Sequence, residues 1–213
     1  MVADLVNDKE FQELAKEYKF LNRVKGDPLG SLEYVILDIE TTGLEPIENE
    51  ITEIGAIKAK GTELIDVFSS LVRPLLPIPP KITELTGIDD DLVKEAPPIK
   101  QVMNRFMDFI GEDTILVAHN ASFDLSFIKH HLKKATNKDL KNSIVCTVKL
   151  ARHLLPKLPN HKLHTVGSHF GFETKNRHRA MGDAELTFLV WQKFLPLLNL
   201  TNKRDLDLLM SKL

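Results

Sequence analysis

The spacing of apolar residues changes from helical to strand-like near residue 30. Apolar side chains recur every three or four positions within residues 11–21, which predicts a short amphipathic helix. Residues 26–30 (GDPLG) then break this pattern. The next three apolar runs, at residues 34–40, 50–60 and 63–74, predict strands, and the two-residue link before the last run suits a hairpin.

Beyond these strands, helical and strand-like patterns alternate along the chain. Residues 98–110 carry an apolar stripe at i, i+3, i+4 and i+7 spacing, which is typical of a helix with one buried face. The other predicted elements are a brief helix ending near Gly87, strands at 114–120 and 143–148, and helices from about 122 and at 147–155, 162–170 and 180–195. This order predicts an α/β fold with a mixed, five-stranded sheet flanked by helices.

Length and composition are those of one globular domain. The chain has 213 residues, of which 43% are hydrophobic and 27% are charged, close to the averages for folded proteins. We expect this domain to span residues 34–195, with an N-terminal helical extension (1–33) before it and a short C-terminal tail (196–213) after it.

The single cysteine and the N-terminus indicate the compartment. Cys146 has no intrachain partner for a disulfide, so we expect it to be a small buried residue in a reducing environment. The N-terminus lacks the apolar segment of a signal peptide, and the chain has no run of 18 apolar residues. We therefore expect a cytoplasmic location and no membrane association.

Charge is unevenly distributed along the chain. The formal net charge is -2, yet residues 120–183 hold 12 Lys or Arg against 4 Asp or Glu, a local net charge of +8. The remaining residues therefore carry -10. The basic part could contact phosphate groups, although solvated helix faces would give the same composition.

Two carboxylates stand at the end of the first predicted strand, within DIETTG (38–43). Side chains alternate along a strand, so Asp38 and Glu40 share one face and lie about 7 Å apart. A pair of this kind also occurs by chance in a chain of this length. However, Asp124 follows the fourth predicted strand and Asp183 begins the last predicted helix, so sheet architecture can bring both to the same place.

Four converging carboxylates would repel one another unless divalent cations lay among them. Oxygen-only ligands favour hard ions, so we expect two Mg²⁺ or Mn²⁺ ions rather than Zn²⁺. Two such ions about 3.5–4 Å apart can hold the attacking and leaving oxygens of a phosphodiester. The acids therefore predict a two-metal site for phosphodiester hydrolysis.

Three segments, DIETTG (38–43), HNASFD (119–124) and HRAMGDA (178–184), resemble in order and spacing the motifs of the DEDDh 3′ to 5′ exonucleases. That family includes the proofreading exonuclease of bacterial DNA polymerase III. The similarity continues between the motifs, for example at ITELTGI (82–88), and covers about residues 34–195. It implies a ribonuclease H-like fold and a metal-dependent exonuclease. Such an enzyme hydrolyses DNA from a free 3′ end and releases nucleoside 5′-monophosphates, in proofreading or repair.

The resemblance also implies roles for individual residues. Those that match the metal ligands are Asp38, Glu40, Asp124 and Asp183. His178 matches the general base, and its distance of five residues from Asp183 marks the histidine branch of the family. An ordinary histidine pKa near 6.5 suits a group that accepts a proton near neutral pH.

Substrate contacts follow from the same resemblance. The turn after the first motif should border the terminal nucleotide, and residues beside the second motif should line the same pocket, although turn chemistry and core packing would also explain them. The expected substrate-binding residues are Thr41, Thr42, Gly43, Leu44, His119, Asn120 and Phe123. We expect the other histidines to face solvent or cap helices: His130, His131, His153, His161, His164 and His169.

The expected partners are single-stranded or frayed 3′ ends of DNA, together with a DNA polymerase subunit as in related proofreading enzymes. Two alternatives remain open. The first is an exonuclease of the same fold that trims RNA, because the catalytic residues do not distinguish the sugar and no residue can be assigned to a 2′-OH contact. The second is a non-catalytic module that binds nucleic acid or a polymerase, against which the complete set of acids and His178 argues.

Overall fold

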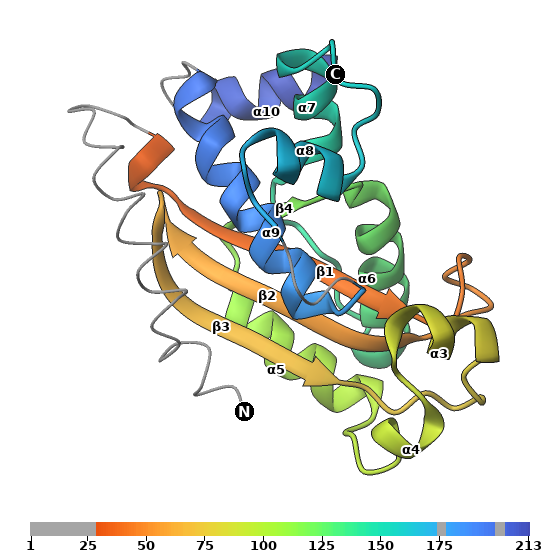
Figure 1. Cartoon of the computed structure of the whole chain (residues 1–213). Coiled ribbons are helices and arrows are strands. Elements are labelled where there is room, and N and C mark those ends of the chain that lie inside the picture. The colour runs from red at the N-terminus through yellow and green to blue at the C-terminus, as the bar shows by residue number, and fades with distance from the viewer. Residues whose placement is uncertain (1–28, 174–177, 199–202) are drawn as a thin grey trace.

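A mixed, five-stranded sheet lies at the centre of the computed structural model, which describes residues 29–173, 178–198 and 203–213 (Figure 1). The strands are β1 (Glu33–Thr41), β2 (Ile51–Lys60), β3 (Glu63–Leu71), β4 (Ile115–Ala118) and β5 (Ile144–Cys146). Their order across the sheet is β3-β2-β1-β4-β5. Neighbours among β1, β2 and β3 pair antiparallel, whereas β4 and β5 run parallel to β1. The predicted α/β fold with a five-stranded mixed sheet is confirmed.

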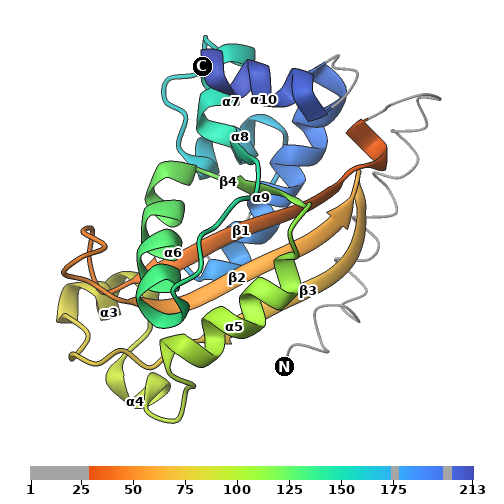
Figure 2. The same ribbon diagram turned by 180° about the vertical axis from the view of Figure 1, so that it is seen from behind.

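Helices cover both faces of this sheet. Helix α9 crosses one face, while α5 and α6 lie on the opposite face (Figures 1 and 2). The helices are α3 (Pro80–Thr86), α4 (Asp90–Val93), α5 (Ile99–Ile110), α6 (Ala121–Thr136), α7 (Thr147–Leu154), α8 (Leu163–His169), α9 (Ala180–Phe194) and α10 (Lys203–Lys212). Two short 3-10 helices, η1 (Leu29–Ser31) and η2 (Leu195–Leu197), complete these elements. Across the described ranges, no helix has both the length and the apolarity needed to cross a bilayer.

Strand β1 is buried on both faces because its apolar residues alternate between two cores. Tyr34 and Ile36 belong to the core on the α9 side, where the rings of Tyr34 and Trp191 lie 5.1 Å apart edge to face. Val35 and Leu37 belong to the core beneath α5 and α6. A central strand packed in this way cannot shift without disturbing both cores. The carboxyl end of β1 is therefore a rigid platform.

Helix α9 lies unusually close to β2 at Gly55. A Cβ atom at this position would lie 2.4 Å from the carbonyl carbon of Ala180 and 2.4 Å from the backbone nitrogen of Met181. These are backbone atoms, so they cannot rotate away as a side chain would. Gly55 thus allows the first turn of α9 to rest directly on the sheet.

The C-terminal residues form more structure than their pattern indicated. Residues 196–213 were expected to be a tail, yet α10 packs against β5, and Leu206 is fully buried in the core on the α9 side. Ser143 also donates a hydrogen bond to Asp207 at 3.4 Å. A helix of ten residues with few apolar positions gives a weak periodic signal, so tertiary contacts decide its place. The helix predicted within residues 11–21 lies outside the described residues.

Two expectations about individual side chains were wrong. Cys146 is only partly buried, because it stands on the edge strand β5. His131 does not face solvent: its side chain is buried on α6 four residues after Phe127, and its Nε2 lies 3.1 Å from the carbonyl oxygen of Asn49. Burial lowers the pKa of His131, so the neutral ring donates to that carbonyl. This bond ties α6 to the loop between β1 and β2.

Replacing Gly55 with alanine should destabilise the fold by about 3 kcal/mol, because the added methyl group forces α9 away from β2. Urea denaturation measures this change in the free energy of unfolding. Gly87→Ala is a suitable comparison, because a Cβ there would meet nothing within 4 Å and φ is 70°. It should cost only the strain of a left-handed residue, about 1 kcal/mol. Equal losses in the two variants would show that the close approach at Gly55 carries no special constraint.

Candidate active site

The carboxyl end of β1 presents two acids on the face that α9 covers. Asp38 and Glu40 are two residues apart on the strand, so both side chains point to this face. In the antiparallel ladder with β2, Asp38 stands opposite Gly55 and Glu40 stands opposite Glu53. Strand pairing therefore adds a third carboxylate, that of Glu53, which sequence reasoning had not singled out.

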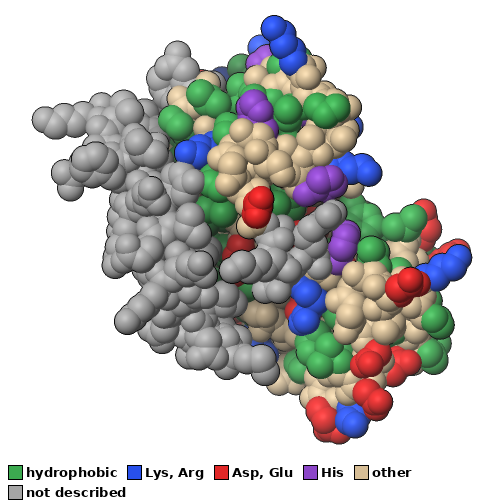
Figure 3. Space-filling model, in the orientation of Figure 1, with side chains coloured by type: hydrophobic (Ala, Val, Ile, Leu, Met, Phe, Trp, Pro, Cys, Tyr) green, Lys and Arg blue, Asp and Glu red, His purple; other side chains and the backbone are tan. Residues whose placement is uncertain are grey.

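Asp183 reaches the same place from the first turn of α9. Ligand oxygens of Asp38, Glu40 and Asp183 all lie within 4.8 Å of one another. The backbone N–H of His178 donates to Oδ2 of Asp183 at 3.2 Å, and the positive end of the helix dipole also favours a carboxylate here. In the surface view of this face, acidic side chains and histidines both lie near its centre (Figure 3).

Asp124 approaches from α6. Its side chain is buried, and the backbone amides of Ile39 and of Asp124 itself donate hydrogen bonds to its carboxylate. The charge of Asp124 raises the pKa of Asp38, as expected for a close neighbour. The fold thus brings together four acids, which we call the acidic group: Asp38, Glu40, Asp124 and Asp183.

The acidic group is electrostatically strained when no cation is bound. Burial, followed by the charges of Asp124 and Asp183, raises the pKa of Asp38 well above its ordinary value. Burial and the charge of Asp183 raise the pKa of Glu40 to about 8, while Arg179 opposes this shift. Burial raises the pKa of Asp124 to about 7. Divalent cations would relieve this repulsion, and a site made only of oxygens suits Mg²⁺ or Mn²⁺.

Glu53 lies beside the acidic group but is fully engaged by protein groups. Arg179 binds both of its oxygens, with Nη2 at 2.7 Å from Oε1 and Nε at 3.1 Å from Oε2. The backbone N–H of Ala180 donates to Oε2 at 2.9 Å. With these three bonds in place, Glu53 is not free to bind a metal. A glutamate within the apolar run at the start of β2 was the sequence signal that could have revealed it.

The backbone around His178 has an unusual conformation. Its φ is 60°, in the left-handed region that residues with side chains rarely adopt. Its N–H is held by Asp183, and the next residue, Arg179, is held by Glu53. These bonds fix the chain on both sides of the His178 α-carbon, next to the acidic group. The role of the imidazole as general base remains a prediction.

The turn after β1 is held in shape by its own hydrogen bonds. The Thr41 hydroxyl donates to the Gly43 carbonyl at 2.6 Å, and the Glu50 N–H donates to the Thr42 hydroxyl at 2.9 Å. Leu44 is 76% exposed although it is a large apolar residue. This arrangement leaves an apolar side chain free for contact beside the acidic group, which is compatible with the substrate role predicted for the turn.

Residues of the second motif also serve structural purposes. Burial lowers the pKa of His119 to about 4, so its ring is neutral. Its Nε2–H donates to the His161 carbonyl at 2.9 Å, and its Nδ1 accepts from the Thr147 hydroxyl at 2.9 Å. Both ring nitrogens are therefore used within the protein. Asn120 starts α6 with a φ of 71°, and the ring of Phe123 packs 5.1 Å from that of Phe127.

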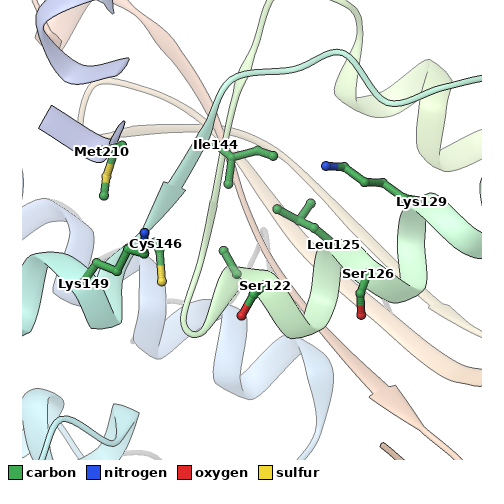
Figure 4. Close-up of a pocket in the computed structure, with 9 residues that line it drawn as sticks. Ser122, Leu125, Ser126, Lys129, Ile144, Cys146, Lys149 and Met210 are labelled. Atoms are coloured by element: carbon green, nitrogen blue, oxygen red, sulfur yellow. The ribbon is translucent and has the colours of Figure 1, made fainter. Parts of the chain in front are cut away.

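A separate pocket of about 440 Å³ lies between α6 and β5, and Asp124 is not among the residues that line it (Figure 4). Side chains of α6 and β5 contribute most of its wall, with further residues from α7 and α10. It is lined by Ala121, Ser122, Leu125, Ser126, Lys129, Ile144, Cys146, Lys149 and Met210. None of these is an acid, so this pocket is not the metal site.

A ribonuclease H-like sheet with an acidic group at the end of its central strand defines a class of nuclease. A family model for exonucleases matches residues 35–190, so the chain belongs to the exonuclease family and is a nuclease of the hydrolase class. It is 44% identical over 174 residues to a DNA polymerase III of the PolC type from Caldanaerobacter subterraneus, and 48% identical over 155 residues to one from Clostridium perfringens. These matches cover 81% and 73% of this chain but only 12% and 11% of the polymerases.

Solved structures show the same fold. Exonuclease X in complex with 5′ overhanging duplex DNA superposes with a TM-score of 0.64 at 26% identity, covering 77% of this chain and 92% of that one. Exonuclease I of E. coli in complex with a dT13 oligonucleotide gives a TM-score of 0.71 at 19% identity, covering 82% of this chain and 45% of that one. These superpositions confirm the ribonuclease H-like fold that the resemblance implied.

The raised pKa values predict that the protein without metal loses stability as pH rises. These carboxyls bind more protons in the folded than in the unfolded state, so the free energy of unfolding falls between about pH 4 and pH 8. In EDTA, we expect Tm to drop by several degrees over this interval, since 1 kcal/mol corresponds to about 2–4 °C in a chain of this size. Mg²⁺ or Mn²⁺ should raise Tm more at the upper end of the interval than at the lower end.

Two variants control this measurement by differential scanning fluorimetry. Asp38→Asn removes one charge from the acidic group, so it should flatten the pH dependence and weaken the metal effect. Asp139→Asn changes an exposed acid and should behave as the wild type. A Tm that does not depend on pH without metal would contradict the raised pKa values. An undiminished metal effect in Asp38→Asn would place the ions elsewhere.

Proposed function

We propose that this chain is a metal-dependent 3′ to 5′ exonuclease that hydrolyses DNA from a free 3′ end and releases nucleoside 5′-monophosphates. The observation that carries the proposal is the convergence of the acidic group at the end of β1, in a chain that belongs to the exonuclease family. The names of its relatives and structural neighbours favour DNA: they are DNA polymerases and exonucleases solved with DNA.

The acidic group fits two Mg²⁺ or Mn²⁺ ions. Its members offer only oxygen ligands, and their raised pKa values reflect a repulsion that divalent cations would remove. Glu53 does not compete for the ions because Arg179 and Ala180 occupy its oxygens. When bound, the ions would neutralise the scissile phosphate and act as Lewis acids on it.

Residues of this chain would supply the remaining steps. The His178 imidazole would accept a proton from the attacking water, and its fixed backbone would keep the ring near the reacting phosphate. The turn from Thr41 to Leu44 would receive the terminal nucleotide, with the exposed Leu44 side chain against a base. Asn120 and Phe123 would border the same space from the start of α6. His119 would contribute by holding this region together.

We infer that the activity serves proofreading or repair beside a DNA polymerase in the cytoplasm. The support is the match to PolC-type DNA polymerases, because a segment of those polymerase chains is similar in sequence to this chain. Single-stranded or frayed ends should be the preferred substrates, because unpairing the terminal nucleotide costs least where the base is already mispaired. A protein that discriminates RNA usually does so at the 2′-OH, so an RNA oligonucleotide of the same sequence tests the alternative substrate.

Hydrolysis should require both a divalent ion and a free 3′ end. We expect no product in excess EDTA and full recovery with Mg²⁺ or Mn²⁺, because the acids without metal would repel the phosphate. A 3′-terminal block should stop digestion of labelled single-stranded DNA, while a 5′ block should not. Cleavage of circular single strands would indicate an endonuclease, and faster digestion of the matching RNA would indicate an RNA-trimming enzyme.

Changes to the acids and to His178 should have different consequences. Replacing any member of the acidic group with alanine should reduce metal affinity and rate together. His178→Ala leaves these acids in place, so it should lower the single-turnover rate by about 10² to 10⁴-fold with metal affinity nearly unchanged. Mn²⁺ binding followed by electron paramagnetic resonance, together with rapid-quench rates, separates the two effects. His153→Ala, at an exposed histidine on α7, is the matched control. Full activity in His178→Ala would remove the base assignment.

A further inference from the structure

We propose that Glu53 and Arg179 act as positioning residues: together they form a clamp that holds His178 and Asp183 in register with the acids of β1. We call this pair the Glu53–Arg179 clamp. The proposal rests on the exonuclease function proposed above and assigns that site two residues that touch neither substrate nor metal. Its basis is the contact geometry between β2 and the start of α9.

The clamp joins two segments that lie far apart in sequence. Glu53 and Arg179 are 126 residues apart, and their side chains form a bidentate ion pair with the shorter distance at 2.7 Å. The Glu53 side chain is 4% exposed, whereas that of Arg179 is 41% exposed. A buried carboxylate held by two parallel N–H···O bonds has one defined orientation. The pair can therefore transmit the position of β2 to the segment before α9.

Glu53 also caps helix α9 from the sheet. Arg179 is the N-cap residue by position, with φ −130° and ψ 129°, but its side chain makes no capping bond. Instead, the Glu53 carboxylate accepts the N–H of Ala180, which is the first residue of the helix. The first N–H groups of a helix have no partner within the helix, so an acceptor outside must satisfy them. Here that acceptor is fixed in the strand next to β1.

The clamp acts on the two residues that the reaction needs. His178 immediately precedes Arg179 and has the left-handed φ of 60°, while its N–H is bound to Asp183. At Gly55, two residues after Glu53, the backbone of α9 touches β2. The start of α9 is thus attached to β2 by an ion pair, a capping bond and a backbone contact. Without the clamp, the strained segment at His178 would lose the contact that holds its C-terminal side.

The pairing also has an electrostatic purpose. Glu53 stands opposite Glu40 in the strand ladder, so an unpaired charge there would add to the repulsion within the acidic group. Arg179 neutralises this fifth carboxylate and occupies both of its oxygens, so they would not be available to a metal ion. An apolar residue in place of Glu53 would avoid the charge but would leave the Ala180 N–H without its acceptor.

Glu53→Ala and Arg179→Lys test the clamp in the full chain. Loss of positioning should lower the single-turnover rate at saturating DNA and Mn²⁺ by roughly 10²-fold in Glu53→Ala, since displacements of about 1 Å have effects of that size. The KM for single-stranded DNA should change less than the rate. Arg179→Lys keeps the charge but not the bidentate geometry, so it should show an intermediate loss. Asp139→Ala breaks an exposed ion pair and should match the wild type.

A structural readout separates this proposal from the proposed function. Amide hydrogen exchange at His178, Ala180 and Asp183, measured by NMR without DNA, should accelerate in both clamp variants, while exchange in the centre of α9 stays unchanged. If the wild type cleaves no DNA but these amides lose protection in the clamp variants, the proposed exonuclease function is wrong and the clamp stands. If the variants retain wild-type protection and rates within threefold, the clamp is wrong whatever the substrate.

A double variant tests whether the pair acts as one unit. If it does, Glu53→Ala combined with Arg179→Lys should lose no more activity than the worse single variant, because the second change removes an interaction already broken. Fully multiplicative losses would mean that the residues act independently and would overturn the clamp. Thermal unfolding of each variant shows whether it is folded at the assay temperature. Arg179→Lys changes the half-exposed partner, so it provides the test if Glu53→Ala does not fold.

Discussion

Repulsion among closely spaced, partly or fully buried carboxylates is the constraint on which the rest of this structure depends. Five acids lie at the carboxyl end of β1, at the neighbouring amino end of β2 or against them, and burial raises the pKa of at least three. A folded chain tolerates such a group only if cations, amides or protons offset the charge. The structure offers a different compensation to different members: Arg179 for Glu53, two amides for Asp124, and the helix start for Asp183. Asp38 and Glu40 retain raised pKa values, and divalent ions would neutralise their charges.

The fold explains how the acids stay together against this repulsion. β1 is the middle strand and is packed on both faces, so Asp38 and Glu40 cannot separate from the sheet. β4 runs parallel to β1, so the chain leaves β4 at the same end and places Asp124 in the first turn of α6. Helix α9 lies on the sheet face opposite α6, and its first turn carries Asp183. Each contributor is a strand or helix rather than a loop, which limits how far the acids can relax apart.

Several polar residues near the site hold the scaffold in place. His119 links the end of β4 to α7 and to the segment before α8, and His131 links α6 to the loop between β1 and β2. Burial lowers the pKa of both histidines, so they act as neutral hydrogen-bonding groups. Among the histidines, left-handed backbone geometry singles out His178, which stands next to the clamp. Proximity to the acidic group alone therefore does not identify a catalytic histidine.

The sequence by itself determined the elements and the chemistry of the acidic group. Period-two and period-3.6 patterns placed the strands and most helices, because such patterns record which face each element buries. Only the tertiary structure decided the partners of Glu53, the burial of His131 and the packing of α10. Glu53 and Arg179 meet across 126 residues, and neither has a local pattern that indicates the other. Local sequence encodes the preference of one segment for a conformation, whereas contacts between distant segments depend on how all of them pack together.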